Sequence, residues 1–442
     1  MDTAALARAQ MGLSLAFHIV FAAFGVGLPL LLVIADTFAA RTGDERYRLL
    51  SRRMAKGTAI LFAVGAVSGT VLSLELGLLW PEFMRRFGEV VGPLFALEGV
   101  AFFLEAIFLG VVLYGRERVS PTAYRLSGVV VALSGAASAA FVTVVNAFMN
   151  LPVEVQWTQG RAFLEEPWRV FLAPSAVTQI VHVLLSCYAV TGFVMAAVHA
   201  TLLLRGRDPS FHRAALNVAL PVAIVSALAM PLSGDLSAKQ VTTHQPWKLA
   251  AMEAHFETKA CAPLLIGGLP DEATGTVRFG LEVPCGLSVL GKMDPNAVIT
   301  GLDQIPPSDR PPVTRTHLSF QVMVGAGGFL ALVSVFALLW RWRKGAWPEQ
   351  RWFLSSLVVA GLAAPMAMEA GWLVTEFGRQ PYVVRGLLLT AEAATKVDGL
   401  MPRLLVFSGV YLFLAATVVS LLLGLFREPE PTIEPHPVPD AA

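Results

Sequence analysis

Ionisable side chains interrupt several long apolar runs of this sequence. They are His18, Glu75, Glu98, Glu105, His182, Glu369 and Glu376, and Met323 lies in a similar run. Ionisable groups inside membrane-spanning segments are energetically expensive, so each of them is a hypothesis of function. Imidazole and thioether groups can bind a metal, and carboxylates can hold and release protons. The residue types therefore indicate cofactor binding and proton transfer within a membrane.

The elements that must position these residues are long apolar segments. The chain of 442 residues is 55% hydrophobic and 15% charged, whereas water-soluble domains carry about 25% charged residues. A helix needs about 20 apolar residues to cross a membrane, and no strand-like alternation runs through the segments. We predict an all-α integral membrane protein with nine transmembrane helices, near 12–36, 55–80, 93–114, 125–149, 175–203, 215–233, 317–340, 352–375 and 402–426. The head before the first span lacks a basic region and a cleavage site, so we interpret that span as retained.

The placement of arginines predicts the orientation of the chain. The connections 41–54, 115–124, 204–214 and 341–351 hold the densest basic stretches, and such stretches favour the cytoplasmic side. We therefore predict an outside N-terminus and a cytoplasmic C-terminus. Residues 427–442 are acidic and Pro-rich, which is typical of a disordered tail.

One connection between the predicted spans is much longer than the others. It covers residues 234–316, between the six helices of residues 1–233 and the three helices of residues 317–426. Loops longer than about 15 residues are usually functional or disordered. This loop holds apolar runs among its prolines and glycines, so we predict that it folds over the outer membrane surface. A helix is predicted within it at "WKLAAMEAHFET".

Four candidate ligands fall at one depth when each helix is followed in its predicted direction at about 1.5 Å per residue. His18, His182, Met323 and Glu376 all lie near the outer face. One common level indicates a bound cofactor, and His with Met is an axial pair for low-spin heme iron. Taken singly, a membrane histidine can instead bond a neighbouring helix, and a lone methionine is usually packing.

Two glutamates in "EGVAFFLE" are seven residues apart. Glu98 and Glu105 therefore lie on one face of a helix, which is an arrangement suited to a proton relay. The alternative is two independent hydrogen-bonding glutamates. The remaining histidines are assigned no chemistry: His199 is interpreted as interfacial beside Arg205, and loop histidines as structural or solvated, namely His212, His244, His255, His317 and His436.

Six short motifs of the sequence are shared with one known family. The most specific is "GRQP" at 378–381, and the others are "FHIVF" around His18, "LEGVAFFLEA" around Glu98 and Glu105, "IVHVLLSCY" around His182, "VVNAFMNLP" around Asn146 and "KLAAMEAHFET" in the loop. On these motifs the chain resembles subunit I of the cytochrome bd-type quinol oxidases, over nearly its whole length. The loop resembles the short form of the quinol-binding loop of this family.

The resemblance implies three hemes, namely two heme b and one heme d, or heme b in place of heme d. It implies His182 and Met323 as the axial ligands of the low-spin heme. It implies His18 and Glu376 as the axial ligands of the two high-spin hemes. Which of these two residues serves the oxygen-reducing heme stays open.

The resemblance also assigns roles around these ligands. Trp372 matches a tryptophan between hemes, and Arg379 would neutralise heme propionates or the carboxylate ligand. In the loop, Lys248 and Glu253 match residues that act in quinol oxidation, and Asp235 matches a polar position at the start of the loop. Without the resemblance, a solvated amphipathic helix would explain the same segment.

Two residues depart from the family pattern. Gln321 stands two residues before Met323 where many members have an arginine, which leaves the tuning of the low-spin heme open. Glu75 replaces a common glutamine. Together with the seven-residue spacing of Glu98 and Glu105 and with the motif "GLLWP", this change favours the branch described as cyanide-insensitive, some of whose members carry heme b in place of heme d.

The function implied is that of a quinol:dioxygen oxidoreductase in the bacterial cytoplasmic (inner) membrane. Quinol would be oxidised at the outer face, and O2 would be reduced to water with protons from the cytoplasm, so charge separates without a pump. The implied partners are subunit II and a small single-helix subunit, with no nucleic acid. Two alternatives remain: a membrane b-type cytochrome that passes quinol electrons to another acceptor, and a non-heme transporter, which typically has broken helices at the midplane.

Three cysteines complete the candidate residues. Cys261 and Cys285 lie in the loop, and the oxidising conditions at an outer face permit a disulfide between them. Two unpaired thiols are the alternative. Cys187 lies within a predicted span and is expected to stay free.

Overall fold

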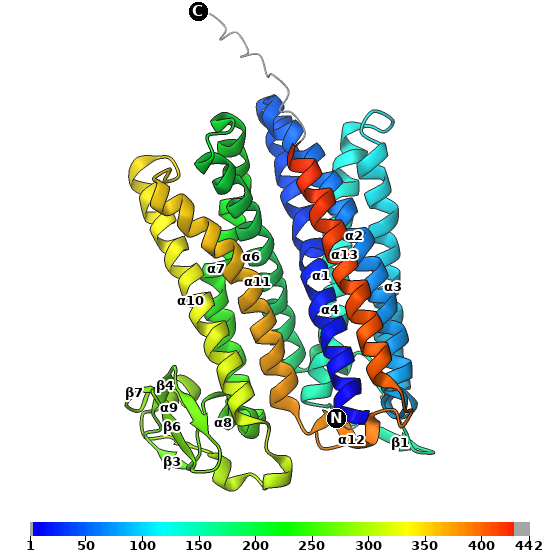
Figure 1. The fold of residues 1–442 in the computed structure, drawn as a ribbon, viewed down its shortest axis with the longest axis vertical. Coiled ribbons are helices and arrows are strands. Elements are labelled where there is room, and N and C mark those ends of the chain that lie inside the picture. The colour runs from blue at the N-terminus through cyan, green and yellow to red at the C-terminus, as the bar shows by residue number, and fades with distance from the viewer. Residues whose placement is uncertain (1–2, 428–442) are drawn as a thin grey trace, which may run out of the picture.

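The structure is a bundle of long helices with a small β-rich domain at one end (Figure 1). The computed structural model describes residues 3–427, so most of the predicted tail 427–442, with His436, lies outside the described residues. Nine helices in the described range are long and apolar enough to cross a membrane, which confirms the predicted fold class. They are α1 (Thr3–Thr42), α2 (Glu45–Leu79), α3 (Pro81–Tyr114), α4 (Pro121–Asn150), α6 (Pro174–Leu204), α7 (Pro209–His244), α10 (Val313–Lys344), α11 (Arg351–Arg379) and α13 (Leu400–Arg427).

The two ends of the bundle differ in what joins the helices. We call the end that holds Thr3 and the connection 245–312 the loop end, and α13 finishes at the opposite end (Figure 1). Several helices begin at a proline, whose fixed φ suits a helix start and whose missing N–H loses no bond there. These prolines are Pro81, Pro121, Pro174, Pro209 and Pro246.

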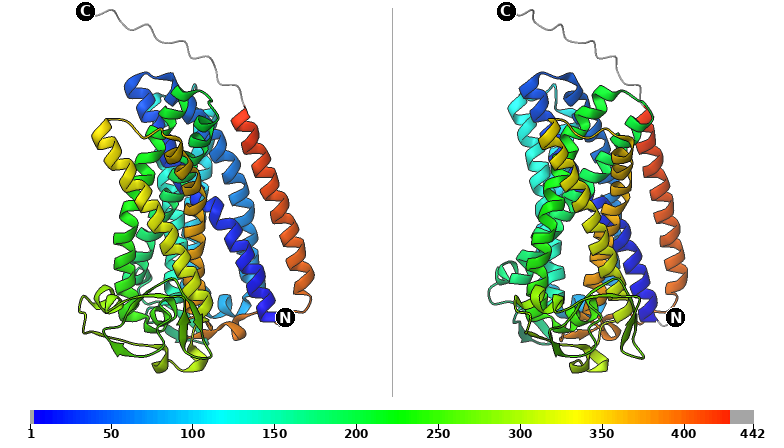
Figure 2. Two further views of the ribbon diagram at one scale, coloured as in Figure 1. Left: turned by 60° about the vertical axis from the view of Figure 1, so that its left-hand side comes forward. Right: turned by 90° about the vertical axis from the view of Figure 1, so that its left-hand side faces the viewer.

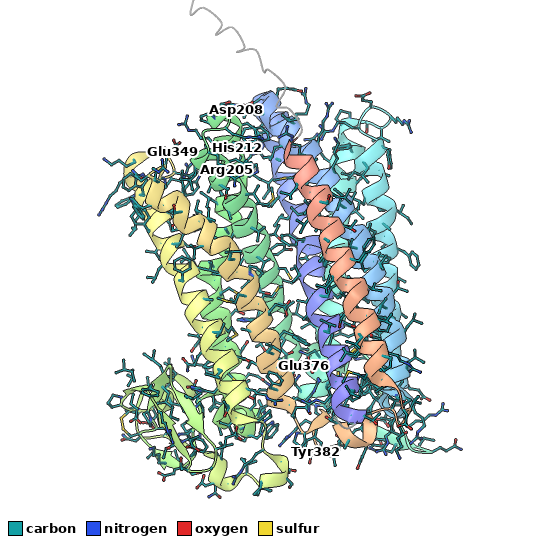
Figure 3. The ribbon with its side chains drawn as sticks, viewed as in Figure 1. Arg205, Asp208, His212, Glu349, Glu376 and Tyr382 are labelled. Carbon is teal, nitrogen blue, oxygen red and sulfur yellow. A yellow bond between two sulfur atoms is a disulfide. The ribbon has the colours of Figure 1, made fainter. Side chains whose placement is uncertain are left out.

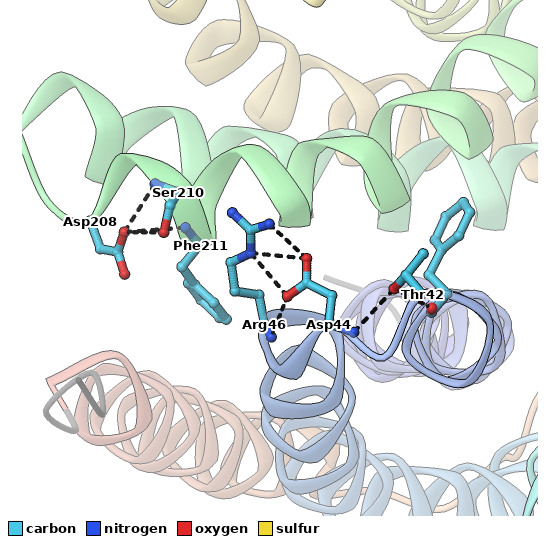
Figure 4. A network of polar contacts seen from close by, with 7 residues as sticks. Thr42, Asp44, Arg46, Asp208, Ser210 and Phe211 are labelled. Atoms are coloured by element: carbon cyan, nitrogen blue, oxygen red, sulfur yellow. Dashed lines mark hydrogen bonds and ion pairs between the residues drawn. The ribbon is translucent and has the colours of Figure 1, made fainter. Parts of the chain in front are cut away.

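Two aspartates cap helices at the opposite end (Figure 4). Asp44 accepts a hydrogen bond from Arg46 N at the start of α2, and Asp208 accepts from Ser210 N and Phe211 N at the start of α7. Such caps satisfy backbone donors that a helix start leaves without partners. The helices at this end are consequently joined by tight turns, and most of the predicted connection 41–54 is helical.

Several helices extend beyond the apolar spans from which they were predicted. α7 continues to His244, so residues 234–244 of the predicted loop are helical. Lys239 pairs with Asp235 one turn away, and pairs at this spacing stabilise a helix outside the membrane as well as inside it. Apolar content therefore marks where a helix meets lipid and not where it ends. The β-rich connection, which we call the loop domain, is residues 245–312.

Eight of the nine long helices of the described chain pack as two groups. One group is α6, α7, α10 and α11, and the other is α1, α2, α3 and α4; they meet where α6 contacts α1 and α4. α13 packs on α1 and α2 at the edge of the bundle (Figure 2). Small residues allow the closest approaches: a Cβ placed on Gly361 of α11 would lie 2.3 Å from the Cβ of Ala197 on α6.

Short elements fill the turns at the loop end. After α4 come β1 (Gln156–Thr158), β2 (Arg161–Phe163) and α5 (Arg169–Leu172), and after α11 come β9 (Tyr382–Val384), β10 (Leu388–Leu389) and α12 (Thr390–Ala393). β1 pairs with β2 and β9 with β10, in both cases antiparallel.

The loop domain consists of α8, α9 and three antiparallel strand pairs. The pairs are β3–β8, β4–β7 and β5–β6. The bounds are α8 (Pro246–Met252), β3 (Lys259–Ala260), β4 (Leu264–Ile266), β5 (Leu269–Asp271), β6 (Thr276–Arg278), β7 (Leu281–Val283), α9 (Gly286–Lys292) and β8 (Val298–Ile299), followed by the single turns η1 (Leu302–Gln304) and η2 (Pro307–Asp309). Two small clusters of apolar side chains form its core. A core of this size stabilises a domain only weakly.

A disulfide between Cys261 and Cys285 compensates for this small core and confirms the predicted pairing. Cys187 is free and buried, as expected. In the chain-entropy model a closed loop of this length contributes about 3 kcal/mol. We expect the double variant Cys261→Ser/Cys285→Ser to exchange the amide hydrogens of residues 259–299 faster, while the amides of α6 and α11 keep their protection. Hydrogen-exchange mass spectrometry of the intact protein measures both, and unchanged exchange in the loop domain would contradict the expectation.

Candidate functional site

The residues predicted to act together gather toward the loop end. Glu376 lies in the last turn of α11 and near Tyr382, whereas His212, Arg205 and Asp208 lie at the opposite end (Figure 3). His182 and Met323 belong to the early parts of α6 and α10, both of which start at the loop end. His18 lies about four turns along α1, which starts at Thr3 at the loop end. The polar set is therefore distributed over one part of the bundle.

His18 is oriented by a serine on the next helix. Its Nδ1 lies 2.9 Å from the hydroxyl of Ser68, and that hydroxyl donates to the backbone oxygens of Val64 and Gly65. Because the hydroxyl proton is already used, Ser68 must accept from Nδ1–H. This tautomer leaves the lone pair on Nε2, which is the form of histidine that binds metals. A Cβ on Gly69 would lie 3.1 Å from the ring, so the glycine leaves room beside it.

His182 and Met323 share this pattern of a neighbouring glycine. The Nδ1 atom of His182 lies 3.3 Å from the Ser233 hydroxyl on α7, and a Cβ on Gly234 would lie 3.8 Å from the ring. A Cβ on Gly371 of α11 would lie 3.0 Å from the Met323 sulfur. Both side chains therefore face positions where the neighbouring helix carries no side chain.

Each residue of the segment "GRQP" has a separate role in the structure. A Cβ on Gly378 would lie 2.8 Å from the Lys248 side chain, so the glycine allows Lys248 to pass. Arg379 Nη2 donates to Glu376 Oε2 at 2.5 Å. Gln380 Oε1 accepts from Thr390 Oγ1, and α11 ends just before Pro381.

The Arg379 guanidinium is buried, with 5% of its surface exposed. Its Nε and Nη1 have no hydrogen-bond partner among the described residues. A buried guanidinium with unused donors is unfavourable unless an anion meets them. The ion pair with Glu376 uses one nitrogen, so two nitrogens of the guanidinium remain available as donors to a further anionic group.

Lys248 connects α8 to the end of α4. Its Nζ donates to Asn150 Oδ1 at 2.5 Å, Asn150 Nδ2 donates to Asn146, and Asn146 Nδ2 donates to Gln179. Lys248 is only 4% exposed. Burial, and then the nearby charge of Arg379, lowers the pKa of Lys248 to about 7. The lysine can therefore change its charge near neutral pH.

Glu253 does not lie in a helix, contrary to the prediction from "WKLAAMEAHFET". α8 ends at Met252, and Ala254 has a positive φ of 47°, because the chain turns there from α8 towards the strands of the loop domain. Glu253 is 5% exposed, and burial raises its pKa to about 8. Its Oε2 has no hydrogen-bond partner among the described residues. The segment is thus a buried turn and not a solvated amphipathic helix.

Glu98 and Glu105 lie on α3 in different surroundings. Glu98 Oε1 accepts from Ser138 Oγ on α4 at 3.2 Å. Glu105 is buried in a niche between two glycines: a Cβ on Gly25 of α1 or on Gly135 of α4 would lie 3.7 or 3.5 Å from its carboxyl oxygens. Glu105 Oε1 has no hydrogen-bond partner in the described part of the chain.

Three other predicted positions have distinct surroundings. Trp372 is half-buried one turn before Glu376 on α11. Glu75 is buried and accepts from Gln10 Nε2 at 2.8 Å. Asp235 lies on α7 and pairs with Lys239, so it belongs to a helix and not to the start of the loop domain.

Sequence reasoning misplaced several histidines. His199 and His212 are both buried, with their Nδ1 atoms 2.9 Å apart, and His212 belongs to α7 and not to a loop. His244 is the last residue of α7. His317 lies in the first turns of α10. His255 and His317 are both buried. His255 contacts the backbone oxygen of Ile299, and His317 contacts those of Met252 and Gly267. Hydropathy cannot reveal such pairs, because it records the environment of a segment and not the partner of a side chain.

Comparisons with known proteins match nearly the whole chain. The family model for cytochrome bd terminal oxidase subunit I matches residues 6–430. A Bacillus subtilis (strain 168) protein described as a cytochrome bd menaquinol oxidase subunit I is 36% identical over 444 residues, which are 99% of this chain and 98% of that protein. The cytochrome bd ubiquinol oxidase subunit 1 of the same organism is 28% identical, over 99% of this chain and 97% of the relative. The solved structure of the bd oxidase from Geobacillus thermodenitrificans is 39% identical with a TM-score of 0.91, and the match covers 97% of this chain and 99% of that one.

Proposed function

Because the chain belongs to the family of cytochrome bd terminal oxidase subunit I, we propose that it binds hemes at the loop end and oxidises quinol beside them. The protein is a quinol oxidase subunit and a multi-pass protein of the bacterial inner membrane. The observation that carries the finer proposal is the contact of Lys248 with Gly378, which joins the loop to the helix end that holds Glu376 and Arg379.

The described residues suit hemes of the kind proposed from the sequence, two heme b with one heme d or a third heme b. His182 and Met323 would hold the low-spin heme, and His18 and Glu376 would hold the high-spin hemes. The Nε2 lone pair of His18 supports this assignment. So do the glycines that neighbouring helices place beside His18, His182 and Met323. The free donors of Arg379 suit a propionate carboxylate. When bound, the hemes supply electron transfer and the reduction of oxygen.

Lys248 and Glu253 would act on quinol from the loop side. A lysine in its charged form steadies the developing quinol oxyanion, and a carboxylate in its charged form accepts the quinol proton. Asn150 fixes the position of Lys248. Burial of both residues excludes water from the place where the proton leaves quinol.

The pKa values of these two groups predict a bell-shaped pH profile for the oxidation of quinol. Lys248 loses its charge above about pH 7, and Glu253 gains its charge only above about pH 8. The form with both charges is most abundant between these values, so kcat/KM for quinol should peak there and fall on either side. Glu253→Gln should remove the rise on the acidic side and leave the alkaline fall. A flat wild-type profile through this range would contradict the assignment.

The proposed topology has the loop end outside the cell and the end of α13 in the cytoplasm. The basic connections at the opposite end of the bundle support it. Protons from quinol would then leave outside, and the protons that form water would come from the cytoplasm past Glu105 and Glu98. Trp372 would lie between the hemes.

The proposed complex contains subunit II, and a small single-helix subunit as a further partner. Apolar side chains of α2 and α3 are exposed over much of their length in this chain, for example Leu74, Leu78, Phe103 and Ile107. Such a surface needs lipid or another membrane chain to cover it.

A visible absorption spectrum of the purified complex tests the proposed function. Heme b bands with the far-red band of heme d, or heme b bands alone, should appear on reduction by quinol and disappear with oxygen. A spectrum without heme bands would rule out the proposal. If heme bands are present but quinol cannot reduce the hemes, the proposed heme site is supported and the proposed quinol site is contradicted.

A further inference from the structure

The ring of His317 lies between two backbone oxygens. Its Nδ1 is 2.8 Å from Met252 O, and its Nε2 is 3.1 Å from Gly267 O. The side chain is 0% exposed. The ring therefore lies within hydrogen-bond distance of both the end of α8 and the loop backbone at Gly267.

The position of Met252 explains why its carbonyl oxygen needs a partner from outside α8. Met252 is the last residue of α8, and the last carbonyls of a helix lack intrahelical partners. A buried carbonyl oxygen without a donor is unfavourable, so the contact with His317 stabilises the end of α8.

Gln321 lies one turn further along α10 and binds the same part of the loop domain. Its Nε2 donates to Leu265 O at 3.1 Å, and its Oε1 accepts from Gly267 N at 2.9 Å. His317 and Gln321 lie on one face of the helix, four residues apart. Together they hold residues 265–267 and the end of α8 through four polar contacts, a group that we call the α10 clamp.

The α10 clamp joins residues that belong to different steps of the proposed function. The residue after Met252 is Glu253, and Met323 follows Gln321 by two positions on α10. The clamp therefore fixes the buried turn of the quinol site against the helix that carries the proposed methionine ligand.

We infer that His317 and Gln321 are positioning residues that fix the loop domain on α10. That this fixes quinol as well rests on the function proposed above. An arginine in place of Gln321 could not accept from Gly267 N, because a guanidinium has no acceptor. The glutamine is thus suited to the loop backbone in this chain.

The test compares three variants in the intact heme-loaded complex. His317→Gln removes the ring that reaches both carbonyl oxygens, and Gln321→Met removes both hydrogen bonds of Gln321 while nearly conserving volume. Thr316→Val is the matched control, because Thr316 is also buried on α10 but its hydroxyl bonds to Pro312 O of its own helix start. Hydrogen exchange of residues 259–271 and the KM for quinol are measured in each, with single-turnover oxygen reduction after dithionite as a reference.

The expected result is exchange at least about tenfold faster in residues 259–271 for His317→Gln and Gln321→Met, and parent exchange for Thr316→Val. KM for quinol should rise in the same two variants, with heme spectra and the dithionite-driven reaction unchanged. Parent-like exchange in His317→Gln would overturn the positioning role of His317, because the two ring contacts would then not be needed to hold the loop domain. Faster exchange with an unchanged KM would overturn the positioning of quinol and leave the heme site untouched.

Discussion

Replacing His182 by alanine is expected to remove the low-spin heme signature and to lower quinol-driven turnover more than about 100-fold. Loss of a residue that merely orients a metal ligand typically costs 10–100-fold, and His182 is proposed as the ligand itself. Met323→Ala should remove the same spectral signature. The structural basis is that both side chains face glycines of neighbouring helices, which place no side chain against them.

His199→Ala provides the control for this experiment. His199 lies on the same helix, α6, and is also buried, but it contacts His212 at the opposite end of the bundle. A general disturbance of α6 would affect both variants alike. Reduced-minus-oxidised spectra separate the cases: an unaltered low-spin band in His182→Ala and Met323→Ala would reject the ligand pair.

The second large effect is expected at Glu105, where glutamine should slow steady-state turnover about 100-fold. General acid–base groups typically contribute 10²–10⁴-fold, and an amide keeps the shape of the carboxyl group but cannot carry its proton. Glu105 lies about 10 Å further along α3 from the loop end than Glu98 at helical rise. The niche between Gly25 and Gly135 gives its carboxylate no competing partner at Oε1 within the described residues.

The readout that isolates proton supply is single-turnover oxygen reduction by the fully reduced variant. Heme content and reduction by quinol should match the parent, so that only the proton-dependent phase is slow. Glu98→Gln serves as a comparison, because Ser138 donates to Glu98 and an amide oxygen can accept the same bond. Parent rates in Glu105→Gln throughout the neutral pH range would remove this residue from the proton path.

Much of the framework follows from hydropathy and helix geometry. Nine apolar segments of membrane length led to nine helices, since a membrane requires every backbone group to be bonded within its own segment. Glu98 and Glu105 lie within one of these segments, so both were placed on one helix, which is α3. The disulfide between Cys261 and Cys285 could be predicted because only these cysteines lie in the loop.

What sequence reasoning missed depends on contacts between distant segments. Asn150 binds Lys248 across 98 residues of chain, and His317 binds Met252 across 65. Neither residue interrupts an apolar run in a way that marks it, so hydropathy gives no warning. Glu253 was assigned to a helix because its neighbours favour helix, but packing of the turn against the bundle decides the end of α8. The sequence marked Gln321 as a departure from the family pattern but did not indicate its role. That role follows from its hydrogen bonds to the loop backbone.

The loop domain is joined to the bundle at two positions, and their placement has a consequence for how members of this family diverge. The domain leaves the bundle at His244 and returns at Val313, and the helices that carry these residues, α7 and α10, pack against each other. A segment with its two ends held close together can gain or lose residues with little penalty, because closure entropy grows slowly with length. Evolution can therefore exchange the part of the chain that meets the electron donor while the ligand-bearing helices stay in register. Adaptation to a new quinone can therefore begin in this connection while the membrane helices are kept.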